Sequence, residues 1–391
     1  LQLLFFGNRR QSLTDFVLSD LGVARYFPYS LERALRLFPS REAIEDYQLC
    51  GELADAYWLY QELDASERDP AFLAELGEVL CEMTFSHEAS RKRWFRLCNR
   101  VARDLERLEQ WALARSLYGR SELHPARERA LRVLEQMEQW EEAQLLVESI
   151  KASPWCEAER DALRRMEPRL LRKMGESVSR HPRETFAEVR LSVPRVSSAV
   201  ESAVAEALSA QWSEVHYVEN TLMCGLFGLA FWEQIFAPVP GAFNNAFQSV
   251  PADMYERDFL RRRQTALEQR LRELEQRSLA EALDEAYTTY EGYQSRWVSW
   301  RSLSRDLVTA ATTCIPSRHL LSIWRRMLFD PGENRRGFPD LIAFGEEPGD
   351  YLMLEVKGPG DALQESQKRW LRHFQSEDSP AQVAWVDWYD D

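Results

Sequence analysis

The 391-residue sequence has only six cysteines, and no two of them form a CxxC pair. Structural zinc sites and disulfide frameworks need cysteines at close, paired spacings. The sequence therefore predicts neither, and instead predicts reduced, buried thiols in a cytosolic protein. The six are scattered along the chain, most of them in apolar surroundings with a helical pattern: Cys50, Cys81, Cys98, Cys156, Cys224 and Cys314.

Long apolar runs are also missing. No run reaches the ~18 residues that are needed to span a bilayer. The apolar start of the chain, residues 1–6, is too short for a signal peptide and lacks a basic leader. The sequence thus predicts a protein without a membrane association.

Positive charge is in deficit, with 49 Lys and Arg against 63 Asp and Glu, for a net charge of −14. This balance excludes a protein that coats nucleic acid non-specifically, but it leaves room for local basic tracks. A hydrophobic content of 45% is ample for real cores, and the length predicts two or three domains.

Glycine and proline are scarce between residues 41 and 175, and apolar residues recur there at helical spacing. The segment 108–114 (LEQWALA) recurs as 137–143 (MEQWEEA), a period of 29 residues, and 53–58 is a looser copy. This repeat predicts paired helices in a degenerate tetratricopeptide-like array.

A basic stripe is predicted on one helix of this region. Between Arg91 and Arg103 there are six basic residues and no acidic one. Apolar residues on another face can enter the core. We expect the stripe to be either a phosphate track for nucleic acid or a solvated basic face. Its members follow a spacing of i, i+3, i+7 and i+10: Arg93, Arg96, Arg100 and Arg103.

The sequence predicts three segments along the chain. Residues 1–40 are expected to form a small N-terminal helical segment, residues 41–175 the repeat domain, and residues 176–391 a second domain with a helical insertion at about 240–315. A long helix is expected from residue 200 to 236. It would carry His216 and Glu219 on nearly the same face, either at a metal site or simply at the helix surface.

The C-terminal part carries the strongest chemical signal. Asp340 follows a proline and opens an apolar run, and a second apolar run ends in Glu355-Val356-Lys357. Residues two apart on a strand share a face, so Glu355 and Lys357 would project together and Asp340 could converge on them. The alternative is two ordinary strands with a solvated Glu and Lys.

Two carboxylates at one point are hard oxygen ligands that suit Mg²⁺ or Mn²⁺. A bound divalent ion lowers the pKa of water and stabilises a leaving oxygen. Lys357 can orient that water or neutralise charge on a phosphate. This arrangement is typical of a PD-(D/E)XK metal-dependent nuclease, whose core is a mixed sheet flanked by helices.

The flanking residues narrow the prediction. The segments 335–341 (RRGFPDL) and 355–361 (EVKGPGD), followed by Gln364, Gln367 and Trp370, resemble a VRR-NUC domain. Helical repeats upstream of such a domain resemble the Fanconi-associated nuclease family, and the chain is identified as a bacterial member.

The resemblance implies a structure-specific DNA nuclease that cuts near 5′ flaps, digests 5′ to 3′ and acts in interstrand cross-link repair, in the bacterial cytoplasm or in a eukaryotic nucleus. It also implies two divalent ions, a branched or 5′-flap DNA partner and a monomer. Lys357, Asp340 and Glu355 are the implied catalytic residues. Further roles are implied for metal ligands (Glu219, Asp340, Glu355 and the Val356 carbonyl), for DNA contacts (Arg335 and Arg336) and for support of the site (Gln367 and His216).

Two alternatives stay open. The chain could be a Holliday junction resolvase or a restriction-type endonuclease that acts as a dimer. It could also be a helical-repeat scaffold with a degenerate nuclease fold, although the intact Asp340, Glu355 and Lys357 argue against this.

Overall fold

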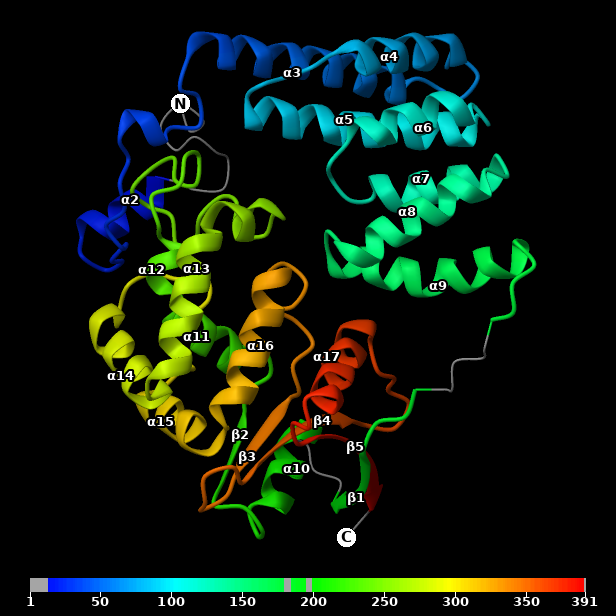
Figure 1. The fold of residues 1–391 in the computed structure, drawn as a ribbon. Coiled ribbons are helices and arrows are strands. Elements are labelled where there is room, and N and C mark those ends of the chain that lie inside the picture. Colours follow the sequence, from blue (N-terminus) through cyan, green and yellow to red (C-terminus); the bar gives the residue numbers. More distant parts are fainter. Residues whose placement is uncertain (1–12, 179–183, 195–198, 390–391) are drawn as a thin grey trace. The chain divides into compact units, whose positions relative to one another are not determined.

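The computed structural model describes residues 13–178, 184–194 and 199–389 (Figure 1). The chain divides into two compact units: Leu37–His181, and Leu1–Arg36 together with Pro182–Asp391. Within the described ranges, none of the helices combines the length and apolarity that crossing a membrane requires.

The first unit, which we call the repeat unit, is built from antiparallel helices joined by short turns (Figure 1). Ser40 caps its first helix, and Asp69 with Pro70 starts the second, as expected at helix N-termini. The helices are α3 (Arg41–Glu62), α4 (Pro70–Glu82), α5 (Glu88–Arg107), α6 (Trp111–Arg120), α7 (Ala126–Gln136), α8 (Trp140–Ala152) and α9 (Glu157–Lys173).

The predicted 29-residue repeat is visible in the backbone. Glu109, between α5 and α6, has φ 58°, and Glu138, between α7 and α8, has φ 54°. Each ends one helix in the left-handed conformation and is followed two residues later by a tryptophan that begins the next helix. The prediction of a mainly helical N-terminal and middle region is confirmed.

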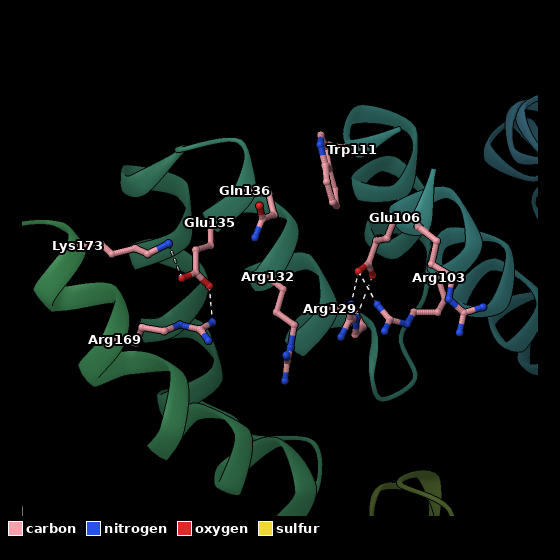
Figure 2. Close-up of a pocket in the computed structure, with 10 residues that line it drawn as sticks. Arg103, Glu106, Trp111, Arg129, Arg132, Glu135, Gln136, Arg169 and Lys173 are labelled. Carbon is pink, nitrogen blue, oxygen red and sulfur yellow. Dashed lines mark hydrogen bonds and ion pairs between the residues drawn. The ribbon is translucent and has the colours of Figure 1, made fainter. Parts of the chain in front are cut away.

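Two buried glutamates repeat at the same interval and join successive helix pairs. Glu106 on α5 accepts from Arg129 on α7, and Glu135 on α7 accepts from Arg169 on α9. Figure 2 shows these pairs beside one another in a pocket of the repeat unit. A buried carboxylate needs such partners, so each pair fixes how one repeat stacks on the next.

The second unit, which we call the nuclease unit after the domain that its sequence resembles, contains a five-stranded sheet in the order β1-β5-β4-β3-β2. Strands β1, β5 and β4 are mutually parallel, whereas β3 is antiparallel to both β4 and β2. The mixed sheet that the sequence predicts is therefore present. Its strands are β1 (Glu188–Pro194), β2 (Glu214–Tyr217), β3 (Leu341–Phe344), β4 (Tyr351–Lys357) and β5 (Ala381–Tyr389).

Helices cover both faces of the sheet. Leu341, Leu354 and Val356 pack with α10 (Val200–Leu208) on one face. Ile342 and Met353 join the large core on the opposite face, to which α11 (Thr221–Ala230), α16 (Ser317–Phe329) and α17 (Glu365–Ser376) contribute. Because β4 alternates, Glu355 and Lys357 belong to this second face.

The prediction of one long helix from residue 200 to 236 is wrong. The segment forms α10, then strand β2, then α11 and the short α12 (Trp232–Ile235). The apolar stretch 222–232 is continuous because α11 is buried on nearly all sides, and periodicity cannot separate such a helix from its neighbours.

The predicted helical insertion forms α13 (Asp258–Gln276), α14 (Leu279–Tyr290) and α15 (Arg305–Cys314). The N-terminal helix α2 (Leu13–Asp20) and the 3-10 turn η1 (Arg33–Leu35) belong to the same unit. Tyr29 stacks on Phe243 with ring centroids 3.8 Å apart. Residues 1–12 lie outside the described part of the chain.

Two glycines of α11 allow the connection between α14 and α15 to lie directly on that helix. A Cβ on Gly228 would lie 2.7 Å from both Trp297 Cβ and Val298 Cγ2, and one on Gly225 would lie 2.7 Å from Leu303 Cδ2. Residues 295–303 are thereby held against α11.

We predict that Gly228→Ala destabilises the nuclease unit by about 1–3 kcal/mol, because the added methyl group overpacks this contact. The matched control is Gly119→Ala on α6, where no atom lies within 4 Å of the added Cβ. It should instead stabilise the repeat unit by about 0.5–1 kcal/mol through helix propensity. Urea unfolding followed by tryptophan fluorescence measures both, and an unchanged Gly228→Ala midpoint would contradict the packing argument.

Candidate active site

The site lies where β3 begins and β4 ends. Asp340 immediately precedes β3, and its Oδ2 accepts a hydrogen bond of 2.9 Å from the Val356 N–H on β4. Glu355 and Lys357 flank Val356 and face the same side of the sheet. The neighbouring strand thus holds Asp340 beside the Glu355–Lys357 pair.

Glu355 is almost fully buried, at 1% exposure. Its Oε1 accepts from Lys357 Nζ at 2.6 Å and from Gln367 Nε2 at 2.5 Å. Its Oε2 is buried and has no partner within the described part of the chain. An unsatisfied carboxylate oxygen in this position is costly unless a further group contacts it.

Gln367 is positioned by the start of α17. Its side chain accepts from the Gln364 N–H at 2.8 Å and closes a capping box. The residue therefore joins the N-terminus of α17 to the Glu355 carboxylate.

Burial raises the pKa of both Glu355 and Asp340. Burial, together with the nearby Asp340 carboxyl, raises the pKa of Glu355 to about 7, against the lowering effect of Lys357. Burial also raises the pKa of Asp340, and the charges of Glu201 and Glu219 add to this. Two neighbouring carboxylates whose charged forms are disfavoured by burial are stabilised when a positive ion binds beside them.

Glu219 reaches the site through its main chain. The N–H groups of Val218 and Glu219 both donate to the Asp340 carbonyl, at 2.9 and 3.0 Å. Glu219 has φ 39°, a conformation that costs a non-glycine residue about 1–2 kcal/mol and is typical of functional sites. Over a hundred residues separate it from Asp340 in the sequence, and only folding unites them.

Two neighbours of Glu219 are absent from the residues that the sequence predicts for the site. Tyr217 Oη donates to Glu219 Oε2 at 3.2 Å, and Asn220 Nδ2 donates to Glu219 Oε1 at 3.0 Å. Asn220 also accepts from the Phe338 N–H at 3.2 Å, which links it to the loop before Asp340. The order Tyr-Val-Glu-Asn alone carries no signal for these roles. The acidic Glu201 at the start of α10 was missed as well.

The expected placement of His216 on a helix is wrong. His216 lies on β2, its Nε2 is 2.7 Å from Glu214 Oε2, and its ring packs near Phe344 at 5.9 Å between centroids. Its contacts are thus with Glu214 and Phe344. Glu233 is the next carboxylate along the chain after Glu219, but it lies on α12 and accepts from the Tyr290 hydroxyl, so its contact is structural.

Arg335 and Arg336 precede the Phe338-Pro339-Asp340 turn. Arg335 stacks on Tyr255, with its guanidinium carbon 4.6 Å from the ring centroid, and donates to the Tyr255 hydroxyl at 3.3 Å. Arg336 is exposed. Both side chains therefore lie close to the chain segment that positions Asp340.

The basic stripe on α5 is largely engaged within the repeat unit. Arg93 donates to the Tyr47 carbonyl and lies over the Tyr47 ring at 4.7 Å, and Arg100 lies over Trp58 at 4.8 Å. Arg103 pairs with Glu106 at 2.9 Å. Arg96 also has an interaction within the chain. The stripe is therefore not a freely solvated row, although its charge remains on the helix.

The described residues fit a metal ion at Asp340 and Glu355, because the donor set is hard and one buried carboxylate oxygen lacks a partner. In the part of the chain that the structure describes, no group of three His, Cys, Asp or Glu side chains is already gathered around a common point. A third carboxylate would have to turn toward the pair.

A buried ExK strand beside an aspartate, on a mixed sheet flanked by helices, defines a nuclease of the PD-(D/E)XK class. In agreement, the model of the VRR-NUC domain matches residues 274–388. The Fanconi-associated nuclease 1 homolog of Pseudomonas aeruginosa is 37% identical over 397 residues, which cover 100% of this chain and 69% of that protein. The chain belongs to the Fanconi-associated nuclease family.

Other relatives match a shorter part. The homolog from Oryza sativa is 32% identical over 164 residues, which cover 41% of this chain and 17% of that protein. The solved structure described as paFAN1 bound to 2-nucleotide 5′-flap DNA with a gap aligns with TM-score 0.77 and 36% identity, covering 100% of this chain and 70% of that one. A 1-nucleotide-flap complex aligns with TM-score 0.75. The chain is thus a divalent-metal-dependent DNA nuclease.

We predict that Asn220→Ala lowers the rate of DNA cleavage by about 10-fold, because Glu219 loses a hydrogen bond to a charged group. Asn220→Asp is the informative comparison. It keeps an acceptor for the Phe338 N–H and so preserves the loop, but it repels Glu219. Its melting temperature should stay near that of the wild type while its cleavage rate falls, and wild-type activity in Asn220→Asp would contradict a role for this contact.

Proposed function

We propose that this protein is a structure-specific nuclease that cuts DNA near 5′ flaps, digests 5′ to 3′ and serves interstrand cross-link repair. The observation that carries the chemistry is the buried Glu355 carboxylate, which is held by Lys357 and Gln367 beside Asp340 with one oxygen unpartnered. The substrate is supported by the likeness to paFAN1, whose structures contain 5′-flap DNA.

We assign Glu219, Asp340, Glu355 and the Val356 carbonyl to metal binding, with two Mg²⁺ or Mn²⁺ ions per site. Bound there, the ions would supply an activated water and charge stabilisation on the phosphate. Asp340 and Glu355 present adjacent carboxylates at the end of the sheet. Asn220 and Tyr217 hold the Glu219 side chain by hydrogen bonds, and from there it would turn toward the pair when a metal binds.

Lys357 has a separate task. Its ammonium group lies 2.6 Å from Glu355 and is mostly buried, so its charge is poorly screened. A cation in this position orients a nucleophilic water or neutralises charge that builds on the transferred phosphate. Gln367, by hydrogen bonding to the same carboxylate, keeps Glu355 in one rotamer. The contacts of His216 do not favour a supporting role.

The wider assignments follow the same proposal. We infer DNA contacts from Arg335 and Arg336 and from the stripe on α5, action as a monomer on branched DNA, and a location in the bacterial cytoplasm. Residues 1–40, 41–175 and 176–391 serve as N-terminal segment, repeat domain and nuclease domain. A resolvase-type dimer is disfavoured because residues 240–315 add three helices to the nuclease unit.

The first test is cleavage of a labelled 5′-flap duplex, compared with a four-way junction. We expect flap cutting that needs Mg²⁺ or Mn²⁺, and no detectable cutting by Asp340→Ala or Glu355→Gln, because both remove a negative ligand. Flap binding in EDTA should stay within several-fold of the wild type. Lys357→Ala should bind metal normally but slow single-turnover cleavage by about 10²–10³-fold.

Preferential cutting of the four-way junction, together with a dimer by light scattering, would instead support the resolvase alternative. Full activity of Glu355→Gln at ordinary metal concentration would overturn the active-site assignment. An inactive wild-type protein that binds flap DNA would favour the scaffold alternative.

The second test concerns the α5 stripe. If it is a phosphate track, the double variant Arg96→Ala, Arg100→Ala should weaken binding to flap DNA of any sequence. The slope of log affinity against log salt should fall by about 0.9 for each phosphate that an arginine no longer neutralises. Cleavage at saturating enzyme should be nearly unchanged. A wild-type salt slope, measured by fluorescence anisotropy, would show that the stripe serves only the packing of the repeat unit.

A further inference from the structure

A small cavity lies next to the candidate active site, with a volume of about 320 Å³. Three different parts of the nuclease unit meet there. These are the start of α11, the connection between α14 and α15, and the loop before Asp340. Its polar lining residues include Asn220, Thr221, Ser295, Arg296, Arg335 and Arg336.

The cavity adjoins the site through two of its own residues. Asn220 lines the cavity and donates to Glu219, which is hydrogen bonded through its main chain to Asp340. Arg335 and Arg336 lie on the loop that leads into Asp340. A ligand bound in the cavity would therefore lie close to the Asp340–Glu355 site.

The charge of the cavity is uncompensated. Across the described ranges, none of its three arginines, Arg296, Arg335 and Arg336, lies within ion-pair distance of a carboxylate. The basic pocket of the repeat unit is different: there Arg103 and Arg129 share Glu106, and Arg169 and Lys173 share Glu135 (Figure 2). In a chain with net charge −14, three unpaired arginines at one cavity are a site for an anion.

The packing of the two residues that follow Arg296 fixes its position. The next two residues, Trp297 and Val298, are both 3% exposed and lie against Gly228 of α11. Trp297 also packs against Phe227, with ring centroids 4.6 Å apart. The guanidinium charges of Arg335 and Arg296 both act on Tyr255 and oppose the effect of burial, which raises the pKa of that residue. The two arginines thus occupy one neighbourhood.

We propose that this cavity binds a DNA phosphate adjacent to the one that is cut, and that the helical insertion supplies Arg296 for this purpose. Arginine is the side chain best suited to a phosphodiester, because its planar fork offers several N–H donors. The start of the ten-residue helix α11 adds its positive dipole end to the same cavity. The proposal rests on the proposed function as a flap nuclease.

The subsite would hold the strand in register with Asp340 and Glu355. A phosphate fixed one position from the reacting phosphate limits the translation and rotation of the strand, and such positioning acts mainly on the chemical step. Arg296 is accordingly a positioning residue, since it contacts the substrate backbone and not the reacting atoms.

The experiment uses the full chain with a series of 5′-flap duplexes, each carrying one neutral methylphosphonate linkage near the cut. In the wild type, one linkage adjacent to the cut should lower kcat/KM by about 10–100-fold, the loss of a hydrogen bond to a charged group. Arg296→Ala should show a similar loss on ordinary DNA and less than about 2-fold further loss at that one linkage. Losses at the other linkages should be unchanged.

The matched control is Arg301→Ala, which removes an exposed arginine of the same connection that does not line the cavity. It should behave as the wild type. Arg296→Gln keeps the stem of the side chain and should repeat the Arg296→Ala result, so a folding defect of the truncated variant would not decide the test. Losses that multiply at every linkage, or an Arg296→Ala variant within about 2-fold of the wild type, would overturn the subsite.

The failure of the proposed function is distinguishable from the failure of the subsite. If the wild type does not cut flap DNA, the proposed function fails, and the subsite is then decided by binding in EDTA. A single methylphosphonate that weakens binding of the wild type but not of Arg296→Ala supports the subsite, and binding equally insensitive in both proteins overturns it.

Discussion

The burial of one carboxylate organises the nuclease unit. Glu355 lies at the end of a strand that is buried on both faces, and an isolated charge there would be prohibitively expensive. Lys357 and Gln367 share its Oε1, while Asp340 lies beside it and is fixed by the Val356 N–H. Each of these partners comes from a different structural position, so the sheet, α17 and the loop before β3 must all be in place for the site to exist.

The same requirement explains the strain around Glu219. Its positive φ is maintained by two main-chain hydrogen bonds to the Asp340 carbonyl and by the side chains of Tyr217 and Asn220. The cost of this conformation is offset by the rigid packing of α11, which is buried on nearly every side. The connection at residues 295–303 depends on α11 in turn, because only glycine at 225 and 228 lets it approach. Arg296 is thus tied, through α11, to the carboxylates.

The repeat unit uses electrostatics differently. Glu106 and Glu135 are each held by two basic side chains, and their pairs with Arg129 and Arg169 join successive helix pairs at the repeat interval. Arginines that serve such pairs are committed to structure, whereas arginines without a carboxylate partner retain their charge for a ligand. This distinction separates the pocket in Figure 2 from the cavity beside the active site, although both are rich in arginine.

The sequence alone determined the patterns that depend on residues close together in the chain. These are the helices with a 29-residue repeat, the alternation of β4, and the combination of Asp340, Glu355 and Lys357. It failed where burial is complete, as in α11, since a helix that is apolar on all sides has no periodicity to mark its ends. It could not place His216 on a strand or find Tyr217, Asn220 and Arg296. Those positions are decided by contacts between segments far apart in the chain, such as His216 with Ile342 and Asn220 with Phe338, and only the tertiary structure brings them together.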